Sequence, residues 1–580
     1  MDGASTRQKV SLLVLVTCAA ALRIDASKAP TGSWDRAAFL SGFQNAAEIP
    51  AHQVRCAQLP SDLVGTYYRN GPARFVGYDG KKVRHPLDAD GLVTGVTLDG
   101  RSGTAVIRQR YVATAGAIAE YAAQRTLYPG HFGNPRALWD GGMRFKNRAN
   151  TNCLWHGGKL LALWEASRPH LLDPLSLATH GEWDVDGLVG SCPMDNFAAH
   201  PRLGSDGGVA NFAYAGNPAA GTTTVRFWDF QPGSYDLRSP AQKHEVPGFG
   251  LFHDFLVTEN YFVLVASLAT WGPVGRPTRA LQMTLEFVTG KRPFGSMICF
   301  DESQPTTVHL YPRDERSGLR PIAIELDTFF FSFHHANAWE EGDTLVFDTV
   351  STPKINRWIR DDSSLKRTKR GHKGDADRNF FEDVDFERDA PRTDLVRYTL
   401  DLKSRSYARR ALSTRHLEYP SVAPSVSGLR HRFVYTTAGS NAEGVTPVAS
   451  VLKTDTEDAS KSQIWLARPF EYCGEVSFTP RAGSTAEDDG YLLTICYDGR
   501  AETSALLVLD ARRVADGPIA RVPLSLAEEE GGEPLPSDAI AGPGHGVHAT
   551  FVPGLAPTLH EVQEAEEHRG RLGSRFLSDA

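Results

Sequence analysis

The sequence has none of the short motifs that mark nucleotide-binding or serine-hydrolase proteins. No Gly-x-Gly-x-x-Gly follows a strand-like stretch, and neither Gly-x-x-x-x-Gly-Lys nor Gly-x-Ser-x-Gly occurs. The usual signals of dinucleotide binding, P-loop nucleotide hydrolysis and serine hydrolysis are therefore missing.

Cysteine is sparse, and a basic surplus is absent. The chain has 7 cysteines in 580 residues, with no C-x-x-C spacing, which argues against a zinc ribbon or a disulfide scaffold. Lys and Arg number 62 against 69 Asp and Glu, for a formal net charge of −7. A dedicated nucleic-acid binder would carry a basic surplus, so no nucleic-acid partner is expected.

Long hydrophobic runs are also lacking, since none approaches the roughly 20 residues that a membrane-spanning helix requires. The most leader-like run is near the N-terminus, where Arg7 and Lys9 precede the uncharged stretch Val10–Leu22. This pattern indicates a targeting leader or anchor over residues 1–28, for the secretory route or a plastid reached through it. Asp2 is atypical of a leader, so the compartment stays open. Residues 29–580 are expected to form a single domain.

Short strand-like segments recur along the chain, many of them ending in an aspartate. Asp at that place can bond the backbone N–H groups of the following residues and so nucleate a turn. The aspartates in this position are Asp99, Asp173, Asp229, Asp301, Asp401 and Asp510, and Gln463–Pro469 is a further candidate hairpin.

Many short strands with little helical periodicity predict an all-β protein. Seven units over residues 29–580 would average about 79 residues each, which suits a β-propeller. From spacing alone, a pair of β-sandwiches or an irregular multi-domain β protein remains possible.

Four histidines stand beside strand-like or turn residues, namely His200, His253, His334 and His548. Their wide spacing excludes a local metal loop, so only the fold could bring them together. A propeller could do so, because the inner strands of its blades face a common axis. His335 follows His334 directly, and strand alternation sends the two side chains to opposite sides, so at most one faces that axis.

The motifs resemble those of the carotenoid cleavage oxygenase family, also called carotenoid and stilbene cleavage dioxygenases, and especially its apocarotenoid-cleaving members. Matching stretches occur in family order over roughly residues 60–555. They include Gly65–Pro72, His85–Gly91, Lys146–Asn152, Leu161–Glu165, His253–Phe255, Phe333–Glu340, Leu417–Pro420, Gly474–Phe478 and the segment around His548.

The resemblance implies a seven-bladed β-propeller with a helical and loop cap over an axial metal site. It implies that His200, His253, His334 and His548 bind a non-haem Fe(II). It also implies that three glutamates contact these histidines, at Glu165, Glu418 and Glu475. His156, His335 and His545 do not match the family ligands.

The residue types suit this chemistry. Neutral imidazoles bind Fe, Cu or Zn, and a carboxylate that accepts the second ring N–H fixes the tautomer and raises ligand basicity. The resemblance implies a dioxygenase that uses O2 to cleave a conjugated double bond of a carotenoid or apocarotenoid into two carbonyl products. Stilbene cleavage and retinoid isomerisation would use the same site, and a non-catalytic lipid-binding propeller or a zinc hydrolase is a further alternative.

A carotenoid substrate resides in a membrane, so peripheral membrane contact is expected. The segment Thr270–Phe294 mixes apolar residues with Arg and Lys, as an interfacial patch would. A cap helix with an ordinary core face would explain it equally well. The sequence departs from the family pattern at Leu87, Ala89 and Val547, which leaves the substrate open.

Overall fold

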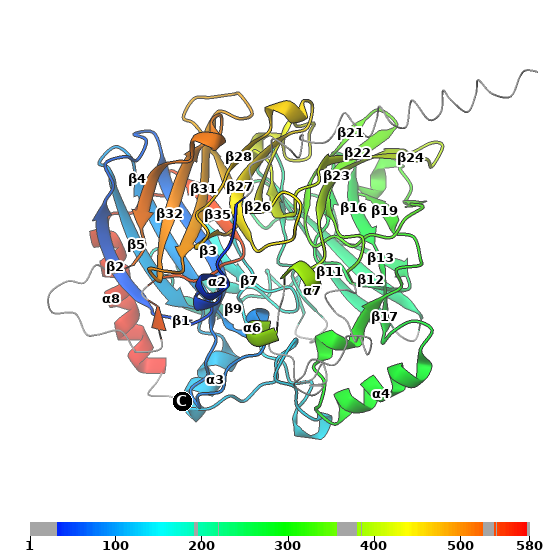
Figure 1. The fold of residues 1–580 in the computed structure, drawn as a ribbon, viewed down its shortest axis with the longest axis horizontal. Coiled ribbons are helices and arrows are strands. Elements are labelled where there is room, and N and C mark those ends of the chain that lie inside the picture. Colours follow the sequence, from blue (N-terminus) through cyan, green and yellow to red (C-terminus); the bar gives the residue numbers. More distant parts are fainter. Residues whose placement is uncertain are drawn as a thin grey trace, which may run out of the picture.

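The computed structural model describes residues 32–190, 195–217, 220–355, 380–383, 386–525, 539–540 and 542–576. The expected leader, residues 1–28, lies outside these residues. Strands dominate the described part of the chain, and helices are few (Figure 1).

Seven antiparallel sheets of four or five strands make up the body of the described structure, and we number them blades 1 to 7. Blade 1 contains β2 (Ile49–Arg55), β5 (Thr104–Tyr111), β4 (Asp90–Asp99), β3 (Val64–Arg74) and β35 (Ala549–Pro553). Blade 2 contains β6 (Asn152–His156), β7 (Lys159–Leu163), β8 (His170–Leu172) and β9 (Thr179–Glu182). Blade 3 contains β10 (Arg202–Leu203), β11 (Val209–Asn217), β12 (Thr222–Phe230) and β13 (Gln242–Pro247).

The remaining four blades follow in chain order. Blade 4 contains β15 (Leu256–Val257), β16 (Tyr261–Ala266), β19 (Thr307–Pro312) and β20 (Ile322–Glu325). Blade 5 contains β21 (His335–Glu341), β22 (Thr344–Ser351), β23 (Asp394–Asp401) and β24 (Tyr407–Ser413). Blade 6 contains β25 (Leu417–Ser421), β26 (Phe433–Gly439), β27 (Val448–Asp455) and β28 (Gln463–Trp465). Blade 7 contains β29 (Glu471–Cys473), β30 (Ser477–Pro480), β31 (Gly490–Asp498), β32 (Thr503–Asp510) and β33 (Pro518–Pro523).

The two ends of the chain close the ring. The late strand β35 pairs with β3, with Arg69 opposite Ala549. Every neighbouring pair of blades shares a buried apolar cluster, including blades 7 and 1, where Leu506 and Val96 belong to the same cluster. The structure is therefore a seven-bladed β-propeller, which confirms the fold predicted from the sequence.

The turn aspartates act as predicted at five of the six positions. Side-chain oxygens of Asp99, Asp173, Asp301, Asp401 and Asp510 accept N–H groups two or three residues further on. Asp229 was predicted to do the same and does not. It is buried and accepts from Arg313 at 2.7 Å, because an ion pair compensates the burial of its charge better than a turn would.

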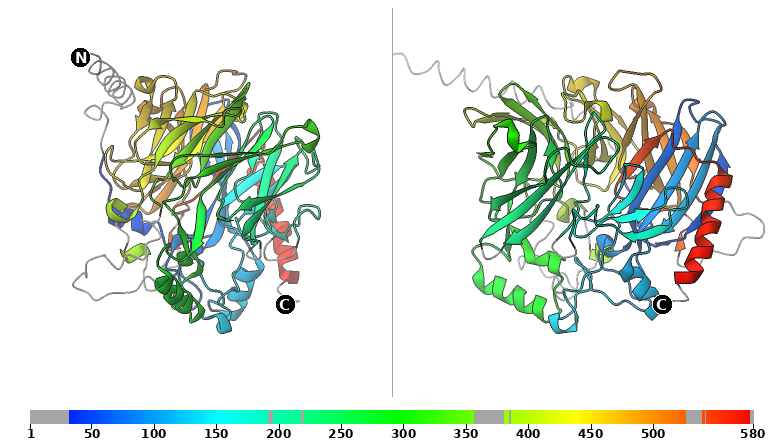
Figure 2. Two further views of the ribbon diagram at one scale, coloured as in Figure 1. Left: turned by 90° about the vertical axis from the view of Figure 1, so that its right-hand side faces the viewer. Right: turned by 180° about the vertical axis from the view of Figure 1, so that it is seen from behind.

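Helices and short strands gather at one face of the propeller and form the cap (Figures 1 and 2). They include α3 (Ala115–Ala123), α4 (Pro277–Val288) and the small sheet of β14 (Phe249–Gly250), β17 (Leu268–Trp271) and β18 (Ile298–Phe300). Helix α4 buries Met283 and Phe287, while Leu281 and Leu285 on it are 62% and 56% exposed. This helix therefore has an ordinary core face and, in addition, exposed apolar side chains.

The helix α8 (Leu559–Phe576) lies against the outer strand of blade 1 (Figure 2). Val562 is buried there, and Glu566 pairs with Arg110 at 2.7 Å. Among the residues described, no helix combines the length and the hydropathy needed to cross a membrane.

Candidate metal centre

The four histidines singled out in the sequence lie near the starts of edge strands in four different blades. His200 precedes β10 of blade 3, and His253 precedes β15 of blade 4. His334 and His548 come directly before β21 of blade 5 and β35 of blade 1. The propeller thus brings together side chains up to 348 positions apart in the chain.

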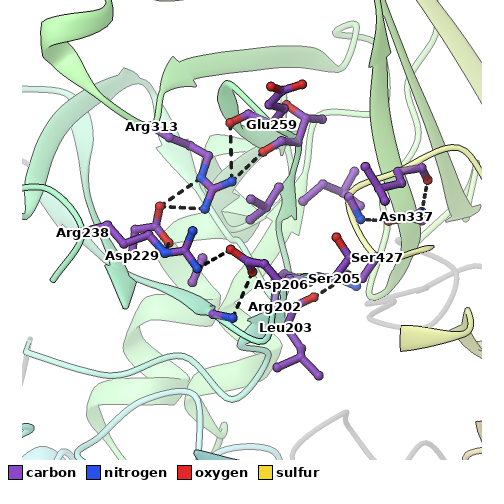
Figure 3. Close-up of a pocket in the computed structure, with 18 residues that line it drawn as sticks. Arg202, Leu203, Ser205, Asp206, Asp229, Arg238, Glu259, Arg313, Asn337 and Ser427 are labelled. Carbon is purple, nitrogen blue, oxygen red and sulfur yellow. Dashed lines mark hydrogen bonds and ion pairs between the residues drawn. The ribbon is translucent and has the colours of Figure 1, made fainter. Parts of the chain in front are cut away.

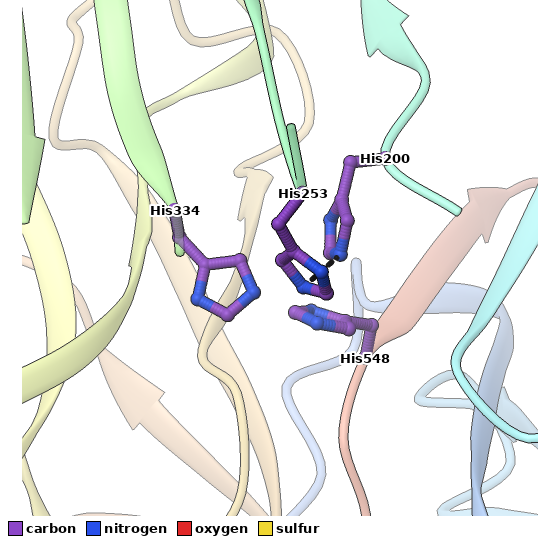
Figure 4. Close-up of side chains that lie close together, drawn as sticks. All are labelled: His200, His253, His334 and His548. Carbon is purple, nitrogen blue, oxygen red and sulfur yellow. Dashed lines mark hydrogen bonds between the residues drawn. The ribbon is translucent and has the colours of Figure 1, made fainter. Parts of the chain in front are cut away.

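Their imidazole rings converge on a single point (Figure 4). One ring nitrogen from each histidine lies within 4.8 Å of the others. The Nε2 atoms of His200 and His253 are 2.9 Å apart. Buried polar atoms normally have hydrogen-bond partners, yet Nε2 of His334 and of His548 have none in the structure.

Burial and mutual repulsion oppose protonation in this cluster. Both lower the pKa of His200 and of His334 well below the usual value for histidine. Neutral imidazoles keep a lone pair on one ring nitrogen, which is the form that binds a metal ion.

Three glutamates contact the other side of the histidine rings. Oε2 of Glu165 lies 2.6 Å from Nδ1 of His253, and Oε2 of Glu418 lies 2.6 Å from Nδ1 of His334. Oε1 of Glu475 lies 3.1 Å from Nδ1 of His548. The glutamates come from blades 2, 6 and 7, so each of the seven blades contributes one residue to the cluster.

Two of these pairs have the same length, 2.6 Å, but their pKa values are shifted in different directions. Burial opposes charge on both Glu165 and His253, but their mutual attraction outweighs it, lowering the pKa of Glu165 and raising that of His253. Burial raises the pKa of Glu418 to about 7 and lowers the pKa of His334, so in this pair burial outweighs the mutual attraction.

His200 differs from the other three histidines. Two asparagine side chains donate hydrogen bonds to the backbone carbonyls just before it, and no glutamate in the part of the chain that the structure describes hydrogen-bonds its ring. Nδ2 of Asn152 donates to the carbonyl of Ala199 at 2.8 Å, and Nδ2 of Asn211 donates to that of Ala198 at 3.1 Å. Among the described residues, no carboxylate forms an ion pair with His200.

The neighbouring histidines that do not match the family pattern are engaged elsewhere. Nδ1 of His335 lies 2.7 Å from the Thr349 hydroxyl, and His335 is not one of the four clustered histidines. His156 contacts the Ser234 carbonyl at 2.7 Å, and His545 contacts a carbonyl of α2 (Arg36–Ser41) at 2.8 Å. As expected, only one of the adjacent His334 and His335 belongs to the cluster, although His334 lies just before β21 rather than within it.

Aromatic residues border the histidines and were not singled out in the sequence. The Phe333 ring lies 5.5 Å from that of His253, and the Tyr419 ring lies 5.5 Å from that of His334. Tyr419 has a φ of 55°, a left-handed conformation that is rare for an aromatic residue, and its N–H donates to Glu418 at 2.7 Å. Such strain accumulates at functional sites.

Sequence reasoning also missed the contacts of Asp254, which follows His253. The buried Asp254 carboxylate accepts from Arg202 of β10 and from the N–H of His335 at 2.9 Å. The sequence shows an acid directly after His253 and a base two residues after His200. Only the folded structure shows that Asp254 and Arg202 contact each other.

The donor set fits a metal ion. Four imidazole nitrogens suit Fe, Cu or Zn by ligand type. A metal ion would also supply the partners that Nε2 of His334 and Nε2 of His548 lack. The contacts of Glu165, Glu418 and Glu475 with Nδ1 leave Nε2 as the nitrogen available to the ion in three of the four rings.

Four histidines converge at the centre of a propeller, and glutamates contact three of their rings. This arrangement defines a class of metal-dependent enzymes. Residues 42–529 match the family of retinal pigment epithelial membrane protein. The chain belongs to this family, the carotenoid cleavage oxygenases, as its motifs predicted.

Relatives in both sequence and structure agree with this assignment. The chain is 31% identical over 502 residues to apocarotenoid-15,15'-oxygenase of Synechocystis sp., covering 84% of this chain and 93% of that protein. It is 28% identical to lignostilbene-alpha,beta-dioxygenase isozyme III of Sphingomonas paucimobilis, covering 82% and 91%. The crystal structure of cobalt-substituted Synechocystis apocarotenoid oxygenase superimposes with a TM-score of 0.75 at 28% identity, covering 90% of this chain and all of that one.

Proposed function

We propose that this chain is a non-haem Fe(II)-dependent dioxygenase that cleaves one conjugated double bond of a carotenoid or apocarotenoid. His200, His253, His334 and His548 would hold the ion. The observation that carries the proposal is the convergence of four imidazole nitrogens within 4.8 Å in a chain similar to an apocarotenoid oxygenase.

Fe(II) bound at this site would supply the binding and activation of O2 beside the substrate alkene. The reaction balances without a reductant, because the cleaved double bond supplies the electrons and both oxygen atoms end in the two carbonyl products. The chain therefore needs to hold the ion, keep the polyene beside it and exclude unwanted water.

Each part of the site has a corresponding task. The glutamates orient the histidine rings and offset part of the charge of the ion. Phe333 and Tyr419 provide apolar surface next to the ligands. Glu165 lies deep in the fold, yet 32% of its side chain is accessible, so open space adjoins the site there.

A series of aromatic contacts leads from that space to the cap. The ring of Trp164, which precedes Glu165, lies 5.2 Å from His131, and the His131 ring lies 6.2 Å from Phe294. Phe294 in turn lies 6.2 Å from Phe287 of α4. These rings would form one wall of an apolar route for a polyene from the cap to the metal.

The exposed apolar residues of the cap support peripheral membrane contact. Leu281 and Leu285 are joined there by Trp271, which is 46% exposed, and Trp139, which is 75% exposed. Arg276 and Lys291 flank α4 and would face anionic headgroups. A substrate dissolved in a bilayer would enter through this face of the propeller.

Stilbene cleavage is the second candidate, favoured by the likeness to the lignostilbene dioxygenase. It would use the same ligands and the same O2 chemistry. The shape of the substrate route decides between the two, so substrate assays are required.

The test begins with metal-free protein loaded anaerobically with Fe(II). O2 labelled with ¹⁸O is then admitted with a panel of carotenoids, apocarotenals and stilbenes, and products are identified by mass. We expect labelled carbonyl products from carotenoid or apocarotenal substrates, loss of activity in His334→Ala, and activity retained in His156→Gln, whose ring lies outside the cluster.

The other outcomes identify the alternatives. Labelled products from stilbenes alone would indicate a stilbene-cleaving enzyme, and a rearranged retinoid without O2 uptake an isomerase. Activity with Zn(II) on hydrolysable substrates would indicate a hydrolase. Fe(II) loading without any product would favour a lipid-binding propeller.

A further inference from the structure

The carboxylate of Asp254 connects three of the four histidine-bearing segments. It belongs to blade 4, directly after His253, and its side chain is 2% exposed. Oδ2 accepts the N–H of His335 in blade 5 at 2.9 Å, one residue after His334. Both oxygens accept from the guanidinium of Arg202 in blade 3, two residues after His200.

Arg202 also donates hydrogen bonds of its own to the segments that Asp254 contacts. Its Nε donates to the Phe255 carbonyl at 2.7 Å, and its Nη2 donates to the His335 carbonyl at 2.9 Å. Arg202 and Asp254 therefore hold both the N–H and the C=O of His335, together with the backbone beside His253. All these contacts lie within two residues of a predicted metal ligand.

The contacts of Asp254 and Arg202 link edge strands that no hydrogen bond between strands joins. Strands β10, β15 and β21 belong to three separate sheets. Side-chain packing joins neighbouring blades, but packing alone allows small sliding movements. A buried, bidentate pair of opposite charge fixes both distance and direction.

Arg202 of this pair also lies at the wall of a cavity of about 300 Å³ (Figure 3). Arg202 lines this cavity, as do Asp206, Asp229, Arg238 and Arg313. The last four residues pair with one another, Arg313 with Asp229 at 2.7 Å. Asp254 is thus the carboxylate that pairs with Arg202. The other ion-pair group of the cavity, Asp206, Asp229, Arg238 and Arg313, does not contact the segments that carry the histidines.

We propose that Asp254 is a positioning residue that acts through Arg202 to set the spacing of His200, His253 and His334. This inference rests on the proposed metal-binding function. It assigns Asp254 no contact with the metal ion or the substrate. Its loss would spread the ligands and lower the affinity for the ion.

Asp229→Asn provides a matched control. It also removes one buried carboxylate from an arginine pair at the same cavity, but Asp229 does not contact a histidine-bearing segment. A merely structural role for Asp254 predicts that both variants lose stability and that neither changes the metal site. A positioning role predicts that only Asp254→Asn changes it.

The experiment measures Co(II) affinity by competition with a chelator and records the visible spectrum of the bound Co(II), which reports ligand geometry. We expect Asp254→Asn to lower the affinity about 10 to 100-fold, in the range found for residues that orient metal ligands, and to alter the spectrum. Asp229→Asn should keep the wild-type affinity within about 2-fold and the wild-type spectrum.

Arg202→Lys is the second variant, should Asp254→Asn fail to fold. It keeps the charge but loses the two-pronged contact, so it should weaken Co(II) binding in the same direction. Because the two residues act as one unit, Arg202→Gln combined with Asp254→Asn should cost little more than Asp254→Asn alone.

Wild-type Co(II) affinity and spectrum in Asp254→Asn or in Arg202→Lys would overturn the inference while leaving the proposed function intact. Equal losses of affinity in Asp254→Asn and Asp229→Asn would also overturn it. A wild-type protein that binds neither Co(II) nor Fe(II) would instead contradict the proposed function.

Discussion

Oε2 of Glu418 lies 2.6 Å from Nδ1 of His334, on the side of the ring away from the other histidines. The opposite nitrogen, Nε2, is buried and has no hydrogen-bond partner. In the proposed metal centre, Glu418 would therefore determine which ring nitrogen of His334 can bind the ion.

Replacing Glu418 by Gln should lower iron affinity or turnover about 10 to 100-fold, because the neutral amide is a weaker acceptor for the ring N–H. Chelator competition and initial rates would measure both quantities. Glu471→Gln is the matched control, since Glu471 is buried in blade 7 and pairs with Arg468 and Arg521. Unchanged iron content and turnover in Glu418→Gln would remove Glu418 from this role.

A buried charge cluster beneath the cap should contribute strongly to stability. Nζ of Lys146 lies 2.6 Å from Asp90 and 2.5 Å from Glu120 of α3, with all three side chains less than 10% exposed. Lys146→Met leaves Glu120 without its cation and Asp90 with only the more distant Arg148, at 3.9 Å, which we expect to cost about 3–5 kcal/mol. Chemical unfolding measures this change.

The exposed pair of Lys403 and Asp343 is the control for that experiment. Lys403→Met should change the free energy of unfolding far less than Lys146→Met does, because exposed ion pairs contribute little. Equal changes in the free energy of unfolding for the two substitutions would contradict the prediction that the Lys146 cluster contributes strongly to stability.

Stability should fall in mild acid because of histidines outside the metal site. Burial lowers the pKa of His309, His416 and His545 to about 4. Between about pH 6.5 and that value the unfolded chain binds more protons than the folded chain, so the free energy of unfolding decreases as the pH falls. Each histidine contributes up to about 1.4 kcal/mol per pH unit.

Unfolding curves from about pH 7.5 to about pH 5 would measure that slope. His309→Gln should flatten it, because it removes one of the buried histidines that resist protonation in the folded chain. An identical slope in His309→Gln and the wild-type protein would contradict the assignment.

Membrane contact through the cap should depend on the exposed face of α4. Leu281→Asp combined with Leu285→Asp should lower the fraction of protein that sediments with liposomes, since both side chains are exposed. Phe287 is unsuitable for this test because it is buried. Leu429→Asp is the control, as Leu429 is 49% exposed in the loop between β25 and β26. Equal sedimentation of all variants would exclude this surface.

Much of the fold could be predicted from local pattern. The segments Tyr261–Val265, Thr344–Phe347 and Tyr491–Ile495 are strands as expected, because apolar, β-branched and aromatic residues between turn residues suit a pleated sheet. The prediction that Asp229 would nucleate a turn was wrong because of a contact that is distant in sequence. Arg313, 84 positions away, pairs with it, and no local pattern reveals that contact.

Local order along the chain was enough to predict the strand-and-turn repeat, the family and the residue types available for a metal centre. Folding placed His334 rather than His335 among the clustered histidines, buried Glu418 so that its pKa rises while that of Glu165 falls, and brought Asp254 into contact with Arg202 and His335. These outcomes depend on distance and burial between blades, which arise only when β35 closes the ring.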